Sequence, residues 1–189
     1  MALNDQATLV IGAGNFYMNP TTGGNAPTDL KAVPSPWVNI GHTSIEDILG
    51  FDTEGGDQTI LKTLQNKSLR TRREAITDTL SLTVQQFDKG SLKLYFGSNS
   101  SDGDFISGAA GEKWLRVKSD PKPTVCAFLA VFIDGENIFA IHIPKCEIMR
   151  GDSPSFDDTE NLAGLPLKIT PLQFEDNDWT MEVTPLSAA

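Results

Sequence analysis

The stretch that decides the fold is Val125-Cys-Ala-Phe-Leu-Ala-Val-Phe-Ile133, then Asp134-Gly135, then Glu136-Asn-Ile-Phe-Ala-Ile-His-Ile143. Two apolar runs of strand length joined by Asp-Gly predict a β-hairpin with a two-residue type I′ turn. In that register Phe128 faces Ile141, and both faces of the hairpin are apolar. An antiparallel sheet with one side in water alternates polar and apolar residues instead. We therefore expect the domain's own core on one face, and a helix or a neighbouring subunit on the other.

The segment before the hairpin predicts one strand and one helix. Residues 76–84 alternate apolar and polar side chains, which is typical of a half-buried strand. Asp78 interrupts the apolar face, so either that end of the strand extends beyond the core or Asp78 has a partner there. Asp88 is a helix N-cap and Gly97 a helix stop, which predicts a short flanking α-helix at about residues 88–96. Its apolar side is expected to hold Leu92, Tyr95 and Phe96.

The rest of the chain extends this mainly β pattern into one domain of 189 residues. Frequent glycine and proline separate short alternating segments, which favours a β-sandwich or a barrel-like fold. Residues 98–111 are rich in Ser, Gly, Asp and Asn, which predicts an exposed mobile loop. Residues 184–189 are expected to form a C-terminal extension that is frayed or lies on a partner.

The two cysteines are expected to be free thiols. The predicted register places Cys126 opposite Ile143 and leaves Cys146 three residues further along, on the order of 10 Å away. That separation is beyond disulfide reach unless a bulge intervenes.

Composition and motifs argue against several classes of function. A net charge of −10 disfavours tight binding to nucleic acid, because phosphate backbones attract basic surfaces. No signal peptide or membrane-length apolar run is present. His42 and His142 lie in no catalytic motif, Gly12-Ala-Gly14 lacks the rest of a dinucleotide fingerprint, and the acidic loops lack the calcium pattern. We therefore expect neither an enzyme nor a bound cofactor or metal.

Residues 43–74 are interpreted as a long interaction arm, because a compact domain rarely contains so long a weakly structured excursion without a role for it. The arm carries four basic residues: Lys67, Arg70, Arg72 and Arg73. Three roles are open to these cations: contact with phosphate, exposure to solvent, or pairing with carboxylates of a neighbouring copy. The acidic composition of the chain favours pairing with carboxylates. Assembly through them should weaken as salt rises.

Several stretches, in this order, resemble the major tail proteins of siphophages that infect actinobacteria. They are Pro36-Trp-Val-Asn-Ile-Gly-His-Thr-Ser44, Glu54-Gly-Gly-Asp57, Leu64-Gln-Asn-Lys-Ser-Leu-Arg70, Gln85-Gln-Phe-Asp88, Leu92-Lys-Leu-Tyr-Phe-Gly97, Phe128-Leu-Ala-Val-Phe-Ile-Asp-Gly-Glu-Asn137 and Leu162-Ala-Gly-Leu-Pro-Leu167. The resemblance covers nearly the whole chain. It implies a tail tube fold, six copies to a ring, rings stacked into a tube, and a long early loop that reaches the next ring. Residues 43–74 occupy the place of that loop.

The resemblance also implies a role, a location and partners. The chain would be a structural subunit of the virion tail, assembled in the host cytoplasm, which forms the conduit for DNA ejection. Its partners would be further copies of itself, the tail tip and tape measure proteins, the tail terminator, and DNA that passes without specific binding. Inter-subunit candidates are the four arm cations with Ile48, Leu49 and Phe51. Lumen candidates are Glu74, Asp78 and Glu147.

Other readings of the sequence remain open. A carbohydrate-binding or receptor-binding β-sandwich would stack a ligand on Trp37, Trp114 or Trp179. Three tryptophans in separate segments fit packing in the core at least as well. A tail terminator, connector or tip component would share the tube-like fold but would not stack without limit. An enzyme with paired carboxylates is permitted by the acidic residues, although no spacing supports it.

Overall fold

The computed structural model describes residues 7–23, 25–46, 48–97, 105–156 and 161–188, and it is mainly β. One antiparallel sheet has the strand order β2-β1-β9-β10-β11-β6-β3. Its strands are β1 (Ala13–Asn19), β2 (Val38–Asn39), β3 (Gly50–Gly55), β6 (Ile76–Val84), β9 (Thr124–Asp134), β10 (Asn137–Arg150) and β11 (Leu165–Pro171), with β12 (Glu182–Val183) and β13 (Ser187–Ala188) added along β10. Two small ribbons pair β4 (Gln58–Leu61) with β5 (Arg70–Arg73) and β7 (Phe105–Ser107) with β8 (Lys113–Leu115).

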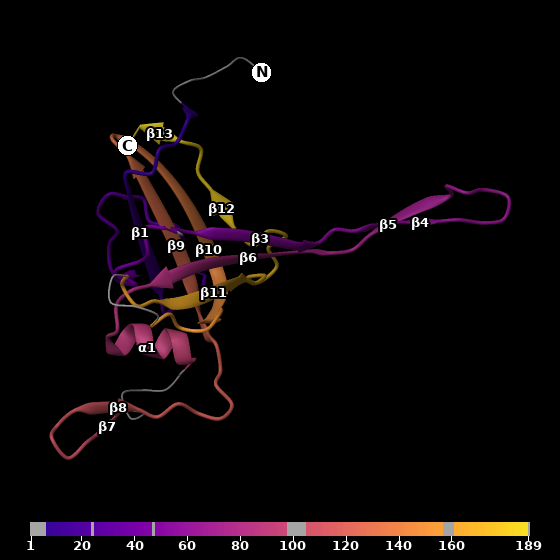
Figure 1. The fold of residues 1–189 in the computed structure, drawn as a ribbon. Coiled ribbons are helices and arrows are strands. Elements are labelled where there is room, and N and C mark those ends of the chain that lie inside the picture. Colours follow the sequence, from indigo (N-terminus) through magenta and orange to yellow (C-terminus); the bar gives the residue numbers. More distant parts are fainter. Residues whose placement is uncertain (1–6, 24, 47, 98–104, 157–160, 189) are drawn as a thin grey trace.

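The sheet is strongly bent, and its two halves enclose the core. Figure 1 shows β1, β9 and the upper part of β10 crossing β11, β6 and β3 at a large angle, without closing a barrel. Apolar side chains from both halves meet inside the bend, among them Phe16, Phe128, Leu80 and Ile169. Helix α1 (Lys89–Phe96) packs against β10 and β11 and completes this core. The predicted mainly β fold with one short flanking helix is confirmed.

Helix α1 begins and ends where the sequence predicts. The Asp88 side chain accepts a hydrogen bond from the Ser91 backbone N–H at 2.8 Å, and this bond lowers the pKa of the Asp88 carboxyl. Gly97 adopts a left-handed conformation with φ 64°, which a residue with a side chain rarely adopts. The buried side of the helix differs from the predicted one, because Leu94 and Tyr95 are buried whereas Leu92 and Phe96 are half-buried.

The central hairpin forms, but its register differs by two residues from the predicted one. Phe128 lies opposite Ile143 instead of Ile141, and the turn residues are Gly135 and Glu136. Gly135 has φ 59° and Glu136 does not have a positive φ, which fits a type II′ turn rather than type I′. A shift of two preserves which face each side chain occupies. Both faces are therefore apolar, as predicted.

The second apolar face of the hairpin is covered by a loop of the same chain, whereas the sequence predicted a helix or a neighbouring subunit there. Trp37 packs on the side of β9 and β10 that faces away from the main core, with Leu30 and Val33 beside it. The helix lies on the opposite face, in the main core. Loop residues between β1 and β2 therefore take the place predicted for the helix or a neighbouring subunit.

A β-bulge in β10 brings the two cysteines together. Pro144 and Lys145 face a single residue of β9, and the register then resumes with Cys146 opposite Cys126. The two Sγ atoms are 3.9 Å apart, both thiols are free, and both are buried. The predicted separation was therefore wrong, although the expectation of free thiols agrees with the structure. The hydrogen bond to Cys126, with burial, raises the pKa of Cys146 well above its usual value, which disfavours the reactive thiolate.

Two segments predicted as irregular contain paired strands. The loop predicted at 98–111 includes β7, which pairs with β8, whereas residues 98–104 lie outside the described residues. The C-terminal extension predicted at 184–189 includes β13, whose residues pair with the start of β10. Both corrections have one cause, since pairing with a distant strand supplies hydrogen bonds that local composition does not reveal.

Candidate assembly surface

The most prominent feature of the molecule is a two-stranded arm formed by residues 50–81 (Figure 1). Pairing keeps one register from Gly50–Ser81 at the base to Leu61–Arg70 near the tip. At about 3.3 Å per residue, the twelve positions in each direction give a length of about 40 Å, and the tip loop at residues 62–69 extends beyond them. The predicted arm ran from 43 to 74, but Ile48 and Leu49 pack on the core and residues 76–81 form the return strand. Strand pairing therefore moves the arm toward the C-terminus.

A pair of glycines forms a joint halfway along the arm. Gly55 has φ 84° and Gly56 has φ 77°, in the left-handed region that favours glycine. A β-carbon on Gly55 would lie 2.3 Å from the Ala75 carbonyl oxygen. The joint lies beside the boundary between a proximal half (residues 50–57 and 74–81), which includes the edge strand β3 of the main sheet, and a distal half (residues 58–73).

The tip of the arm is held by its own hydrogen bonds. Thr63 N–H donates to the Asn66 carbonyl at 2.8 Å, and Asn66 N–H donates back to Thr63 Oγ1 at 3.0 Å. Ser68 N–H donates to Asn66 Oδ1 at 3.0 Å. A turn with these bonds presents the neighbouring side chains in a defined arrangement instead of as a random coil.

The predicted inter-subunit residues divide into exposed and packed groups. The four predicted cations are exposed on the distal half: Lys67, Arg70, Arg72 and Arg73. Phe51, 52% exposed, lies near the base with Ile76, 63% exposed, on the side of the ribbon that continues the core face. Ile48 and Leu49 are half-buried against the core, so their apolar surface is mostly occupied within the subunit. The composition of residues 58–73 also identifies Lys62, which the sequence prediction missed.

The predicted lumen carboxylates do not share one surface. Glu74 lies on the exposed arm. Asp78 lies on the core side of β6, where the Thr53 hydroxyl donates to it at 2.8 Å, so the interruption in the apolar face has a partner. Glu147 lies opposite Thr170 on the other face of the sheet. The registers place Lys168 and Ser81 on that same face, which is partly exposed and polar across β10, β11 and β6.

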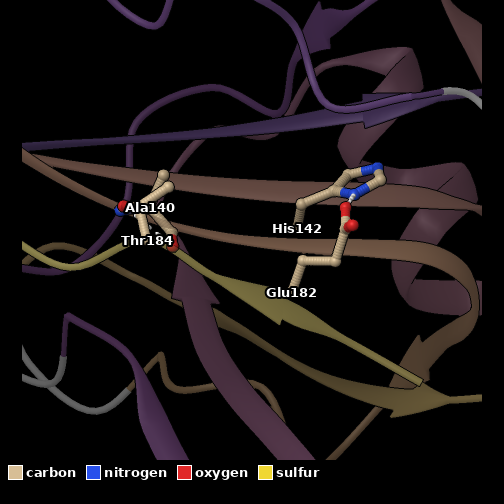
Figure 2. Close-up of polar contacts among 4 residues, drawn as sticks. All are labelled: Ala140, His142, Glu182 and Thr184. Carbon is tan, nitrogen blue, oxygen red and sulfur yellow. Dashed lines mark hydrogen bonds and ion pairs between the residues drawn. The ribbon is translucent and has the colours of Figure 1, made fainter. Parts of the chain in front are cut away.

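The C-terminal residues cover the upper edge of β10 through two polar contacts shown in Figure 2. Thr184 bonds twice to Ala140, since its N–H donates to the carbonyl at 2.9 Å and its Oγ1 accepts from the N–H at 2.8 Å. Glu182 Oε2 lies 2.8 Å from Nδ1 of His142, which is 3% exposed. A carboxylate accepts, so Nδ1 carries the proton. Without this segment the apolar edge of β10 would be open to association.

Replacing Thr184 with Val is expected to destabilise the subunit by about 1–3 kcal/mol. The change preserves the shape of the side chain but leaves the buried Ala140 N–H without an acceptor. Urea unfolding would measure the free energy of unfolding. Thr28→Val at an exposed position is the matched control and should change it by less than about 0.5 kcal/mol. Equal stability of the two variants would show that the contact to Ala140 does not hold the segment.

Groups that could support catalysis or ligand binding are dispersed. The described residues contain no cluster of His, Cys, Asp and Glu suited to a metal ion. Trp37 is buried, whereas Trp114 on β8 and Trp179 near the C-terminus are exposed. The Trp114 indole N–H donates to Glu112 at 3.1 Å. Among the described residues, no helix is both long enough and apolar enough to cross a membrane.

Comparison with known proteins identifies the family. Residues 1–188 match the family described as phage tail tube protein. The major tail protein Gp23 of Mycobacterium phage D29 is 32% identical to this chain, over 93% of the chain and 90% of that protein. The major tail protein Gp23 of Mycobacterium phage L5 is 31% identical, with the same coverage of both proteins. These relatives carry the name of major tail proteins, and none of these matches is to an enzyme.

Proposed function

The chain belongs to the phage tail tube protein family, and from this premise we propose that its copies form six-membered rings that stack into the hollow tube of a virion tail. It is a structural subunit of a bacteriophage tail and not an enzyme. In the proposed assembly, DNA leaves the virion through the lumen during ejection into the host. No covalent chemistry is required of the subunit.

The observation that carries this proposal is the arm. A ribbon of about 40 Å with a loop beyond it is longer than the subunit needs for its own core, and its distal half is exposed on both faces. An exposed two-stranded ribbon is marginal alone and gains stability by lying on another surface. In a stack of rings, the arm of one subunit reaches the next ring. The exposed cations Lys67, Arg70, Arg72 and Arg73, with Phe51 at the base, would then contact the neighbouring copy.

We assign the lumen to the polar face that carries Glu147. This face bears Glu147, Thr170, Lys168 and Ser81, whereas the opposite face of the same strands is the core. A sheet with one polar face suits a wall whose other side is covered by protein. Asp78 belongs to the core side, and Glu74 to the arm. Of the three predicted lumen carboxylates, we therefore retain Glu147. The charges of Glu147 and Lys168 balance, so these residues give the wall no net positive charge that would trap DNA.

The remaining partners follow from the position of a tube in a tail. We propose that the first ring is nucleated by tail tip and tape measure proteins and that the last ring meets the tail terminator. Assembly takes place in the host cytoplasm, before release of the virion. The open edge of the sheet at β3 becomes a contact between subunits, which removes a surface prone to uncontrolled pairing.

Purified protein examined by electron microscopy at rising concentration is expected to form long hollow tubes of stacked six-membered rings. Light scattering would first establish the starting oligomeric state, and tail tips would be added as seeds if the protein alone remains dispersed. The density would show which face lines the lumen, with Glu147 expected there. A protein that stays monomeric with seeds present would refute the proposal. Tubes are expected to form less readily as salt rises, because screening weakens contacts between charged subunits.

A further inference from the structure

The arm is divided into two halves of opposite charge. The proximal half contains five carboxylates and no Lys or Arg: Asp52, Glu54, Asp57, Glu74 and Asp78. The distal half contains five cations and no Asp or Glu: Lys62, Lys67, Arg70, Arg72 and Arg73. The boundary between the two charges lies just beyond the glycine joint, between Asp57 and Gln58. The charges therefore follow the structural halves of the arm.

These charges are not neutralised within the subunit. The four distal pairs, Gln58–Arg73, Thr59–Arg72, Ile60–Thr71 and Leu61–Arg70, place no carboxylate opposite an arginine. In the described part of the chain, none of the ten arm charges takes part in an ion pair. Nine of them are exposed and Asp78 is half-buried. Each half therefore concentrates like charges that repel one another, which an opposite charge from outside would relieve.

The rest of the chain makes the distal half unusual. Removing its charge of +5 from the net charge of −10 leaves −15 on all other residues. Two subunit bodies therefore repel each other, and the distal half is the segment with the charge to bring them together. Complementary potentials favour encounter and fix the register of a contact.

The two halves contain equal numbers of residues, and the base has a free edge. The proximal half takes eight residues in each direction, about 26 Å, whereas the distal half consists of four paired residues in each direction, about 13 Å, and the tip loop at residues 62–69. Strand β3 ends the main sheet, so its outer edge has no strand partner among the described residues. Such an edge accepts another strand side by side, with side chains of the two ribbons in adjacent rows.

We infer that the basic distal half of each arm lies alongside the acidic proximal half of the arm of a neighbouring copy, with the two arms parallel and staggered by half an arm length. This inference rests on the proposed function. Two antiparallel arms would satisfy both halves at once and close a dimer, whereas staggered parallel arms leave one half free for the next copy. Only the staggered arrangement propagates along a polar tube.

Two charge-reversed variants test the pairing. The tip variant carries Arg70→Glu, Arg72→Glu and Arg73→Glu, and the base variant carries Asp52→Lys, Glu54→Lys and Asp57→Lys. Each variant alone brings like charges together, so the concentration needed for tubes is expected to rise about tenfold or more. The changes take the distal half from +5 to −1 and the proximal half from −5 to +1. Mixing the two variants therefore restores the pairing of +5 with −5 at alternate contacts. Combining all six changes in one chain places −1 against +1 and so removes the repulsion that each single variant creates. Both are expected to regain tubes in electron micrographs.

The controls separate this inference from the proposed function. Glu136→Lys, Asp176→Lys and Asp178→Lys change exposed carboxylates outside the arm by the same net charge as the base variant, and this control should assemble like the wild type. Circular dichroism and thermal unfolding establish that every variant is folded. If the wild type forms tubes but neither the mixture nor the six-residue variant does, the staggered pairing is wrong and the tube stands. A stable dimer in light scattering would favour antiparallel arms and overturn the inference. Failure of the wild type to form tubes would refute both.

Discussion

Replacing residues 56–75 with the two-residue turn Asn-Gly is expected to leave a folded subunit that forms no tubes. Gly55 and Ile76 lie opposite each other, so a two-residue type I′ turn can join them without changing the register of β3 and β6. The removed side chains are exposed and lie outside both buried clusters of the core. The midpoint of thermal unfolding should therefore stay close to that of the wild type. Electron microscopy would measure tube formation, and light scattering would measure the oligomeric state.

A graded variant shows which part of the arm is required. Replacing residues 62–69 with Asn-Gly joins Leu61 to Arg70, which also lie opposite each other, and removes the tip loop while retaining three arginines. It should form tubes at a higher concentration than the wild type, because Lys62 and Lys67 are lost. Tubes of normal length from the fully shortened variant would show that the arm does not hold the rings together. Loss of the cooperative unfolding transition would instead show that the arm supports the fold.

Elements that are encoded locally were predicted closely. Strand β6 spans Ile76–Val84, the predicted bounds, because its alternation of apolar and polar residues continues without interruption by glycine or proline. Helix α1 follows from Asp88 and Gly97, whose preferences for the two ends of a helix have physical causes within a few residues. The arm was predicted as a long excursion, but its predicted end at residue 74 is too early. Residues 76–81 were assigned to a strand of the core, and they also form the return strand of the arm.

The hairpin register was missed because Asp-Gly and Gly-Glu turns are both compatible with the same apolar pattern. A shift of two residues preserves the faces, so periodicity cannot distinguish the two registers. Asp134 does not have the positive φ that a type I′ turn at Asp134-Gly135 requires, and it pairs with Asn137 instead. The bulge was missed for a related reason. Pro144 has no N–H, which weakens the ladder at that point, but the two residues of the bulge are fixed by distant partners. The Gly23 N–H donates to the Pro144 carbonyl and the Leu172 N–H donates to the Lys145 carbonyl.

The charge pattern of the arm was predicted in part, from composition alone. Four of the five distal cations were identified because basic residues are conspicuous in an acidic chain. The acidic proximal half was overlooked, since carboxylates are common in this sequence and their grouping is visible only once strand pairing brings residues 50–57 beside residues 74–81. The opposite orientations of Asp78 and Glu147 likewise depend on strand registers that pair residues far apart in the chain.

Replacing Trp37 with Ala is expected to destabilise the isolated subunit by about 3–5 kcal/mol, because it empties the cover over the second face of the hairpin. Sequence reasoning expected that cover to be a helix or a neighbouring subunit. The segment between β1 and β2 shows no regular spacing of apolar residues that would predict its packing. Trp37 was therefore interpreted as a core residue or as a ring on which a ligand stacks. If a neighbour provided the cover, the stability of the free subunit would not depend on Trp37. Urea unfolding of the monomer therefore distinguishes a cover within the chain from one between chains.

Trp114→Ala is the matched control, since this indole is 60% exposed on β8 and its loss should change the free energy of unfolding by less than about 0.5 kcal/mol. A loss of 3–5 kcal/mol is a large share of the roughly 5–15 kcal/mol that stabilises a typical domain, so the Ala variant can fail to fold. In that case Trp37→Phe is measured instead, because it retains an aromatic ring over Leu129 and Ala140 and should lower the free energy of unfolding by less. Equal stability of Trp37→Ala and Trp114→Ala would assign the cover to a neighbouring subunit. A large difference would show that each subunit covers the second face of its own hairpin before assembly, and that the arm is then the main surface left for its neighbours.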